Sequence, residues 1–562
     1  MINPTILKRS EGSLSVNEDT KKLFQIIYRE QNKSDKEDDD APRIRVSDMV
    51  SKMSFYYEKI RNSVDYKEEY LLRKNAIQRI LKRQIVIQGL NTKEFDSNEI
   101  ARNVLVELIR AGYLSNNKIR ESKIDEVGAI VEKYLKLRKC FVEMTKNSSQ
   151  QAVNKEVVNE WNDLINWLIS LLASEIEVNL CKSEINKAVI QQMKKVLDRN
   201  IVLTSDSPYI QDKEIQINVG IYRNFLKYDY DMLNVVLFQS LSPEWFDKPN
   251  DQYIQKTAEN ITALRNKIHF QISHPLVGQF NRIIGRYTIF FTILVEVIKE
   301  NPKTVYENFQ KDPKAFPRQI KNVYNKRYSN YKNKLWRAAV RSIIYIFLTK
   351  SIFAILLEVP ASKWLGEDVN NISLAINVTF PALFLFIMVL FTKFPSQDNS
   401  TKVAEGIEEI IFVERERKEP FELRQPAKRS RTMQAIFSII YTTTFFLTFG
   451  LIVWALEQIQ FSWVSIIIFL FFLAFASFFS IRIRKNLKDL IIIPPKENIF
   501  SFMADFFYVP IVATGKWLSE KFQRINVFVF FLDFIIEAPF KIFVEIAEEW
   551  TKYVKERKDE LV

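Results

Sequence analysis

The sequence predicts an all-α integral membrane protein with four transmembrane helices, a large N-terminal cytoplasmic helical domain and a C-terminal amphipathic helical region. Three observations predict it. Four apolar runs lie between residues 338 and 484, each near the length of about 20 residues that a helix needs to cross a bilayer. Much of the remaining chain repeats apolar residues at helical spacing. Strand patterns are nearly absent, and the 562 residues include only 11 glycines.

The N-terminal half is predicted to be soluble. Residues 1–46 are polar and read as a flexible segment, in which KSDKEDDD at 33–40 is a charged linker. Residues 47–310 are interpreted as one all-helical cytoplasmic domain, long enough to bury a core. Within it, Ser97 is expected to cap a helix that stops at Gly112. A basic juxtamembrane segment follows at 311–337.

The four predicted spans are residues 338–357, 372–391, 433–456 and 461–481, which form a transmembrane domain at 338–484. The last three contain no charged side chain, whereas the first carries Arg341 near its start and Lys350 inside it. A soluble helix rarely needs so many consecutive apolar positions, because one of its faces meets water.

The charges that flank the spans predict the orientation. Lys and Arg are concentrated before the first span, between the second and third, and after the fourth, and the other two connections are poor in both. Because Lys and Arg collect on the cytoplasmic side of a membrane, both termini are predicted to be cytoplasmic. Trp364, Trp454 and Trp463 lie near the opposite face, where indoles favour the headgroup region.

The composition limits the partners and cofactors. The net charge is +13, and much of the excess lies beside the spans, where each base near anionic lipid contributes about 1 kcal/mol. The expected partner is therefore an anionic bilayer at the cytoplasmic face, and nucleic acid is not expected. Cys140 and Cys181 are the only cysteines and there are two histidines, too few for a zinc-type cluster. No metal and no cofactor are predicted.

The C-terminal region, residues 485–562, is predicted to form amphipathic or interfacial helices and a charged tail. Its most apolar part, Val527–Phe540, reads VFVFFLDFIIEAPF and is shorter than a span, so it is expected to be interfacial or re-entrant. Asp533 and Glu537 in this run are four residues apart and therefore share a helix face.

Four polar residues are candidate functional groups: Lys350, Asn377, Asp533 and Glu537. Ionisable groups within a membrane usually face a partner or water. Lys350 is expected either to pair with one of the two acids, or to line a polar path, or to extend to the outer headgroups. The two acids suit proton or ion handling, although Glu537 can also simply pair with Lys541. Asn377 suits helix packing or the broken helix of a transporter.

A second candidate pair lies in the soluble domain. Arg265 and His269, in the sequence RNKIH, resemble the arginine–histidine motif of HEPN ribonucleases. That motif has four to six residues between the two, whereas three separate Arg265 from His269 and eight separate it from His274. The plain alternative is a surface pair one helical turn apart.

Three stretches carry a resemblance to a known family: YIFLTKSIFAILLEVP (345–360), AINVTFPALFLFIM (375–388) and RINVFVFFLDFIIEAPFKIFVEIAEEW (524–550). They resemble an uncharacterised family of four-span membrane proteins from candidate-phylum bacteria. The resemblance covers roughly the C-terminal half. It implies a bacterial inner membrane location and no mechanism.

The leading functional expectation is a non-enzymatic, membrane-anchored scaffold that docks an unidentified protein partner, since no catalytic residue is assigned. The alternative is an oligomeric channel or transporter-like protein, in which a ring of identical chains brings Lys350 and the two acids to a lumen. A third hypothesis, a membrane-tethered HEPN-like ribonuclease, depends on Arg265 and His269 alone.

Overall fold

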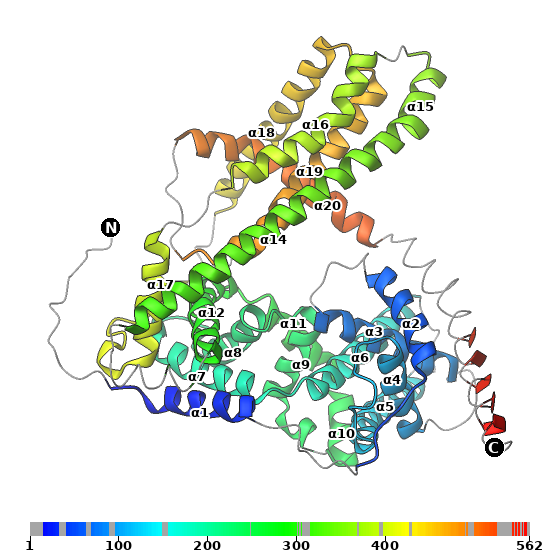
Figure 1. Cartoon of the computed structure of the whole chain (residues 1–562), viewed down its shortest axis with the longest axis vertical. Helices are drawn as coiled ribbons and strands as arrows, with labels where there is room; N and C mark the ends of the chain where they lie inside the picture. The colour runs from blue at the N-terminus through cyan, green and yellow to red at the C-terminus, as the bar shows by residue number, and fades with distance from the viewer. Residues whose placement is uncertain are drawn as a thin grey trace. The chain divides into compact units, whose positions relative to one another are not determined.

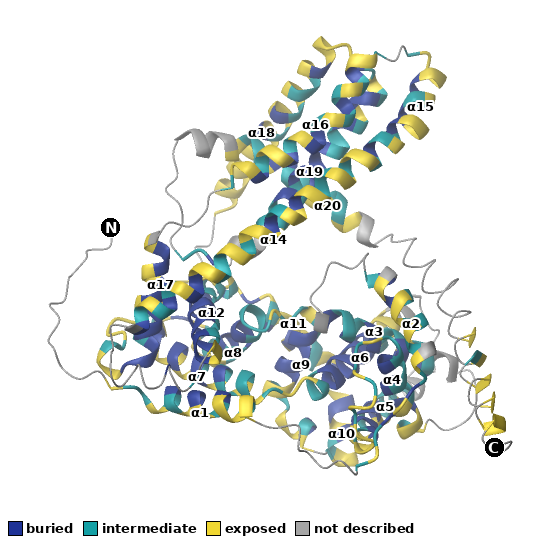
Figure 2. Ribbon diagram, viewed as in Figure 1, coloured by how far each residue is buried: buried dark blue, intermediate teal, exposed yellow. Residues whose placement is uncertain are grey.

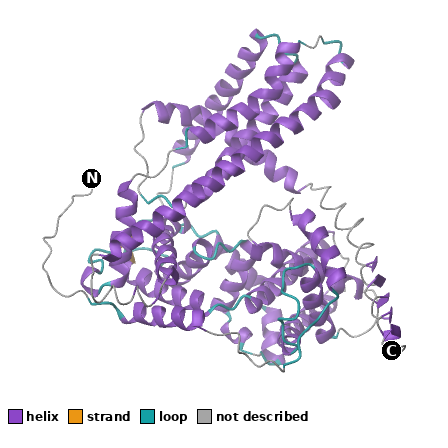
Figure 3. Cartoon of the chain, in the orientation of Figure 1, coloured by secondary structure: helices purple, strands orange, loops and turns teal. Residues whose placement is uncertain are grey.

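The computed structural model is nearly all-α (Figures 1 and 3). It describes residues 15–32, 41–62, 69–88, 96–148, 155–247, 249–300, 302, 305, 315–367, 370–392, 397–425, 430–488, 490–492, 499–524 and several short pieces between 542 and 558. The helices before the first span are α1 (Glu18–Asn32), α2 (Asp48–Asn62), α3 (Glu69–Gln88), α4 (Ser97–Arg110), α5 (Ser122–Ser148), α6 (Lys155–Leu180), α7 (Glu184–Asn200), α8 (Lys213–Asn224), α9 (Tyr230–Leu241), α10 (Asp251–Glu259), α11 (Ile261–Ile272) and α12 (Val277–Glu300). The later helices are α14 (Ala315–Phe353), α15 (Val359–Trp364), α16 (Asn371–Leu390), α17 (Gln397–Ile411), α18 (Arg431–Gln458), α19 (Trp463–Lys488) and α20 (Ile499–Arg524).

The chain divides into two compact units. The bundle unit holds the described residues of 1–17, 289–416 and 426–526, and the helical unit holds those of 18–288, 417–425 and 527–562. These limits differ from the predicted soluble domain at 47–310. The helical unit begins earlier, ends within α12, and includes a short piece of the connection between the second and third predicted spans.

The residues of α4 show how the helical unit is built. Ile100, Val104, Leu105 and Leu108 recur at helical spacing, and all four are buried. The cap differs by one residue from the prediction of Ser97, because the carboxylate of Asp96 accepts hydrogen bonds from the backbone N–H groups of Asn98 and Glu99. An aspartate at this position satisfies donors that the first turn leaves unpaired. Gly112 follows the helix with a φ of 78°, as the predicted stop requires.

The prediction that residues 1–46 are flexible is wrong for α1. Leu23, Phe24 and Ile27 form a buried stripe on α1, which packs against α7. A buried hydrogen bond joins the two helices, from the side-chain amide of Gln192 to the hydroxyl of Thr20. This stripe has the spacing of an amphipathic helix and is visible in the sequence. Residues 1–14 and 33–40 lie outside the described residues.

Two short parallel strands join distant parts of the chain within the helical unit. β1 (Ile201–Leu203) pairs with β2 (Phe421–Leu423), with Ile201 opposite Phe421. The side-chain amide of Gln279 on α12 holds the same segment, by donating to the backbone oxygen of Arg424 and accepting from its N–H. Since β2 comes from the connection between the second and third predicted spans, that connection is more than a basic loop.

Four helices among the described residues are long and apolar enough to cross a membrane: Phe316–Trp364, Asn371–Leu390, Arg431–Gln458 and Trp463–Arg484. Each contains most or all of one predicted span. The first is longer than predicted, because α14 continues through a π-helical turn, Ala354–Glu358, into α15. Much of the predicted juxtamembrane segment is therefore the start of the same helix. The bent pair of α6 and α7 also reaches the required length, but α6 lies in the core of the helical unit.

The helix α20 packs along α19, where an interfacial helix was predicted. Ile511 joins an apolar cluster with Phe469 and Leu473 of α19. Gly515 approaches α19 so closely that an added Cβ would overlap the carbonyl oxygen of Ala474. Residues 525–541, which include the run 527–540, lie outside the described residues.

Most of α18 is exposed or half-buried (Figure 2), and many of its exposed side chains are large and apolar. At one end of the spans three tryptophans face outward: Trp364 is 87% exposed, Trp454 61% and Trp463 62%. We call this the tryptophan end. Large exposed apolar side chains on a helix of spanning length suit contact with lipid or with another membrane helix.

Candidate functional site: a buried ion pair in the helical bundle

The first span carries both members of a buried ion pair, Lys350 and Glu358. In a regular α-helix, residues eight apart lie roughly 80° apart around the axis. The π-helical turn at Ala354–Glu358 absorbs an extra residue, which brings Glu358 close to the face of Lys350. Single π-turns inside α-helices are frequent at functional sites.

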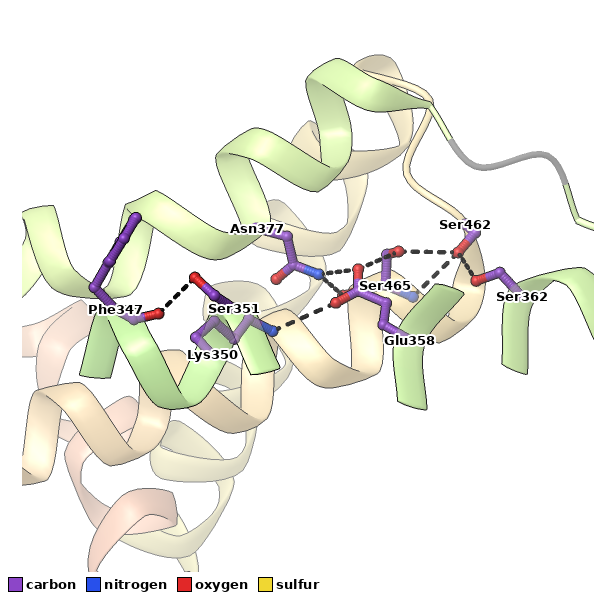
Figure 4. Close-up of polar contacts among 8 residues, drawn as sticks. All are labelled: Phe347, Lys350, Ser351, Glu358, Ser362, Asn377, Ser462 and Ser465. Carbon is purple, nitrogen blue, oxygen red and sulfur yellow. Dashed lines mark hydrogen bonds and ion pairs between the residues drawn. The ribbon is translucent and has the colours of Figure 1, made fainter. Parts of the chain in front are cut away.

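The pair is closed off from solvent and held by two neighbouring helices (Figure 4). Lys350 Nζ lies 3.7 Å from Glu358 Oε2, and neither side chain is more than 1% exposed. On α16, the side-chain amide of Asn377 donates to Glu358 Oε1. On α19, the hydroxyl of Ser465 donates to the same oxygen at 2.7 Å. Asn377 also donates to the backbone oxygen of Ser465 at 3.3 Å.

A row of hydroxyl groups extends from the carboxylate toward the tryptophan end. Ser462 Oγ donates to Ser465 Oγ at 3.1 Å, and Ser362 Oγ on α15 lies 3.2 Å from Ser462 Oγ. Figure 4 shows the three hydroxyls in sequence. Ser465 and Ser362 are buried and Ser462 is half-buried. We call these three residues the hydroxyl chain.

Aromatic rings cover the other side of the pair. The ring of Phe472 on α19 lies 4.4 Å from Lys350 Nζ, measured to its centroid, and packs edge-on against Phe353. An ammonium over an aromatic face gains electrostatic stabilisation in a dry environment. The ion pair is thus contacted by a hydroxyl at Glu358 and by an aromatic ring at Lys350.

Three atoms around the ion pair have no hydrogen-bond partner within the described residues: Lys350 Nζ, Glu358 Oε2 and Asn377 Oδ1. The 3.7 Å between the two charged atoms is too long for a hydrogen bond. A buried polar group that lacks a partner costs about 1–3 kcal/mol, and more when it is charged. Because one donor and two acceptors without partners surround the ion pair, this site favours the binding of a small polar molecule or ion.

The position of the site within the span follows from chain distances. Glu358 precedes Trp364 by six residues, or roughly 9 Å along a helix that rises 1.5 Å per residue. Ser465 lies two residues after the start of α19 and Asn377 six after the start of α16. Glu358 and its partners therefore occupy the half of the bundle nearest the tryptophan end.

The structure brings together two of the predicted candidates, Lys350 and Asn377, through an acid that the sequence reasoning missed. The sequence places Glu358 in the connection after the first span, because the predicted helix ends at residue 357. Lys350 points to this acid, and its side chain is buried within the bundle unit. The missed signal is Pro360, which suits the first turn of a continuing helix as well as a break. Asp533 and Glu537 lie outside the described residues.

Arg265 and His269 lie on α11 in the helical unit. The guanidinium of Arg265 lies 5.9 Å from the ring centroid of Trp167. His269 Nδ1 lies 3.2 Å from the hydroxyl of Tyr230. His274 is separate and buried, with Nε2 at 3.5 Å from a carboxylate oxygen of Asp212. The two histidines therefore occupy different environments.

Protonation of His274 is expected to destabilise the helical unit. Its Nδ1 accepts a hydrogen bond from the backbone N–H of Leu276, so a proton on Nδ1 would break that bond. Burial lowers the pKa of His274, and the nearby Asp212 opposes this in part. The unfolded chain then binds the proton more readily, so stability is fully present above the usual histidine pKa of about 6.5 and falls as the pH drops below it.

The measurement for this prediction is urea unfolding of the full chain between pH 5 and 8, followed by a probe in the helical unit. His274→Gln should flatten the loss of stability below pH 6.5. The control is His269→Gln, which removes the other histidine from the exposed side of α11. An unchanged pH slope in His274→Gln would show that other groups set it.

The chemistry open to the buried pair is proton exchange and binding of a small polar guest. Within the part of the chain that the structure describes, no group of three His, Cys, Asp or Glu side chains is placed to hold a metal ion. No protein-family model, no curated protein and no solved structure matches the chain.

Proposed function

We propose that this chain is a multi-pass membrane protein of the channel or transporter class, and that its bundle binds a proton at the Lys350–Glu358 pair. The observation that carries the proposal is the buried pair itself, with its unfilled hydrogen-bonding atoms. An ionisable group inside a span is costly, with insertion scales giving about 2.5–3.5 kcal/mol for a position at the centre of the helix. Apolar residues of similar size would hold an anchor together at a lower cost.

The orientation we propose has both termini in the cytoplasm of a bacterial cell and the spans in its inner membrane. Basic residues flank one end of the spans, and the exposed tryptophans lie at the other. Since Lys and Arg favour the cytoplasmic side, the tryptophan end faces outward. The basic end would contact anionic lipid. The exposed apolar side of α18 would contact lipid or a second copy of the chain.

The test is proton flux through the full chain in liposomes that contain a pH-sensitive dye. With a potassium-driven membrane potential, we expect flux above that of empty vesicles. Glu358→Gln should reduce it at least tenfold, since glutamine keeps the shape of the side chain and cannot take up a proton. The control is Glu457→Gln, which neutralises an exposed carboxylate at the tryptophan end.

The double variant Lys350→Gln with Glu358→Gln distinguishes loss of the proton-binding group from misfolding. It removes both charges and so leaves neither unpaired. It should be folded and without flux. Equal flux in Glu358→Gln and the unaltered chain would overturn the proposal, as would flux no greater than that of empty vesicles.

A second function, a membrane-anchored scaffold, is favoured by the helical unit. It has its own continuous core, formed by residues from Ile44 to Ile268, as a docking module requires. The test is cross-linking and mass spectrometry after gentle solubilisation from native membranes. Stoichiometric cross-links from residues 18–288 to another protein would support the scaffold. A closed homo-oligomer without another protein would contradict it and agree with the channel class.

A further inference from the structure

We infer that Glu358 is the group that takes up the proton, and that the hydroxyls of Ser462 and Ser465 are its route from the tryptophan end. The inference rests on the proposed function and deepens it, because it names the binding group and the side of access.

The directions of the hydrogen bonds support this proton route. Ser465 donates to Glu358 Oε1, and Ser462 donates to Ser465 Oγ. Each hydroxyl therefore points its proton toward the carboxylate. Ser362 lies within hydrogen-bond distance of Ser462, and Ser462 is the half-buried member where solvent can deliver a proton.

The transfer balances atom by atom. A proton from water binds Ser462 Oγ, Ser462 passes its own proton to Ser465 Oγ, and Ser465 passes its own to Glu358 Oε1. Each hydroxyl gains one proton and gives up one, and the carboxylate becomes a carboxylic acid. The hydroxyls then point outward and must rotate before the next transfer.

The groups around Glu358 suit a proton better than a metal ion or an anion. Within the described residues, Lys350 is the charged group that faces it, from the same span, whereas α16 contributes the neutral Asn377 and α19 the neutral Ser465. The described residues offer no group of three His, Cys, Asp or Glu side chains for a metal ion, and the carboxylate repels an anion that approaches Lys350. A proton needs no set of ligands, and it neutralises the carboxylate directly.

The apolar stretch of α19 beyond Ser465 offers no hydroxyl route from the other end. Phe472, seven residues after Ser465 on that helix, lies with its ring centroid 4.4 Å from Lys350 Nζ. The next hydrogen-bonded hydroxyls on α19 are those of Ser477, which donates to the Leu473 oxygen of its own helix, and Ser480, which lies 2.7 Å from the hydroxyl of Tyr508 on α20. A proton on Glu358 therefore exchanges with the tryptophan end in this conformation.

The first experiment identifies the proton-binding group without requiring transport. A hydrophobic carbodiimide modifies carboxyl groups that are protonated in apolar surroundings. With the full chain in detergent, we expect mass spectrometry to find modified Glu358. Absence of modification at Glu358 would overturn its assignment.

The second experiment tests the route by flux in liposomes. Ser465→Ala should lower the proton flux at least tenfold, and Ser465→Thr, which keeps the hydroxyl, should restore most of it. The matched control is Ser351→Ala, since within the part of the chain that the structure describes the Ser351 hydroxyl donates to its own helix, at the Phe347 oxygen. Undiminished flux in Ser465→Ala would overturn the route. Modified Glu358 with no flux in any variant would overturn the proposed function and leave Glu358 as the proton-binding group.

Discussion

Lys350→Met is expected to lower the free energy of unfolding of the bundle by about 3–5 kcal/mol, the usual cost of removing one partner from a buried ion pair. The variant leaves the carboxylate of Glu358 charged and without its ammonium, in a place where neither side chain is more than 1% exposed. Adding Glu358→Gln should recover most of the loss. The new amide oxygen can still accept from Asn377 and Ser465, and no charge remains.

The measurement is reversible unfolding in mixed micelles, followed by tryptophan fluorescence. The control is Lys363→Met, which removes an exposed lysine near the tryptophan end and should change stability by less than about 0.5 kcal/mol. If Lys350→Met is as mild as Lys363→Met, the two charges are not coupled. A double variant that stays folded yet loses proton flux would separate the functional contribution of the pair from its structural one.

Gly515→Ala should have the second largest effect, a loss of about 3 kcal/mol, at the upper end of the usual cost of overpacking. The added methyl group would overlap the carbonyl oxygen of Ala474 and lie 3.0 Å from Phe478 Cβ. A backbone carbonyl cannot rotate away as a long side chain can. Relief therefore requires α20 to move away from α19.

The matched variant for this prediction is Gly450→Ala on α18, where an added Cβ meets no atom within 4 Å. Alanine favours a helix over glycine by about 1 kcal/mol, so this variant should be neutral or stabilising in the same unfolding measurement. Equal effects at Gly515 and Gly450 would show that α20 does not pack tightly on α19 in solution.

The spans were predictable because apolar length is a property of one stretch of sequence, and Lys350 stood out as a charge within such a stretch. Glu358 was not, because its position depends on a π-helical turn and on a helix that continues past Pro360. The turn and the continuing helix both depend on packing against α16 and α19, which no local sequence pattern indicates.

The contacts of α20 and those of β2 could not be predicted from the sequence, for different reasons. Lys516 and Glu520 lower the hydropathy of α20, so its apolar side does not resemble a span, and the close approach at Gly515 depends on the small residue opposite it. β2 is three residues long and pairs with a strand more than 200 residues earlier. A strand of that length has too little local signal to separate it from a loop.

The pairing of β1 with β2 has a consequence for biosynthesis. Residues 18–288 are made before any span, and N-terminal domains generally fold first as a chain is synthesised. Here β1 has no partner strand until Phe421–Leu423 have left the ribosome, which is after the first two spans have been made. The helical unit therefore completes its fold only once the first two candidate spans have been made. An arrest of translation just before residue 421 would leave a protein in which β1 of the helical unit still lacks its partner strand.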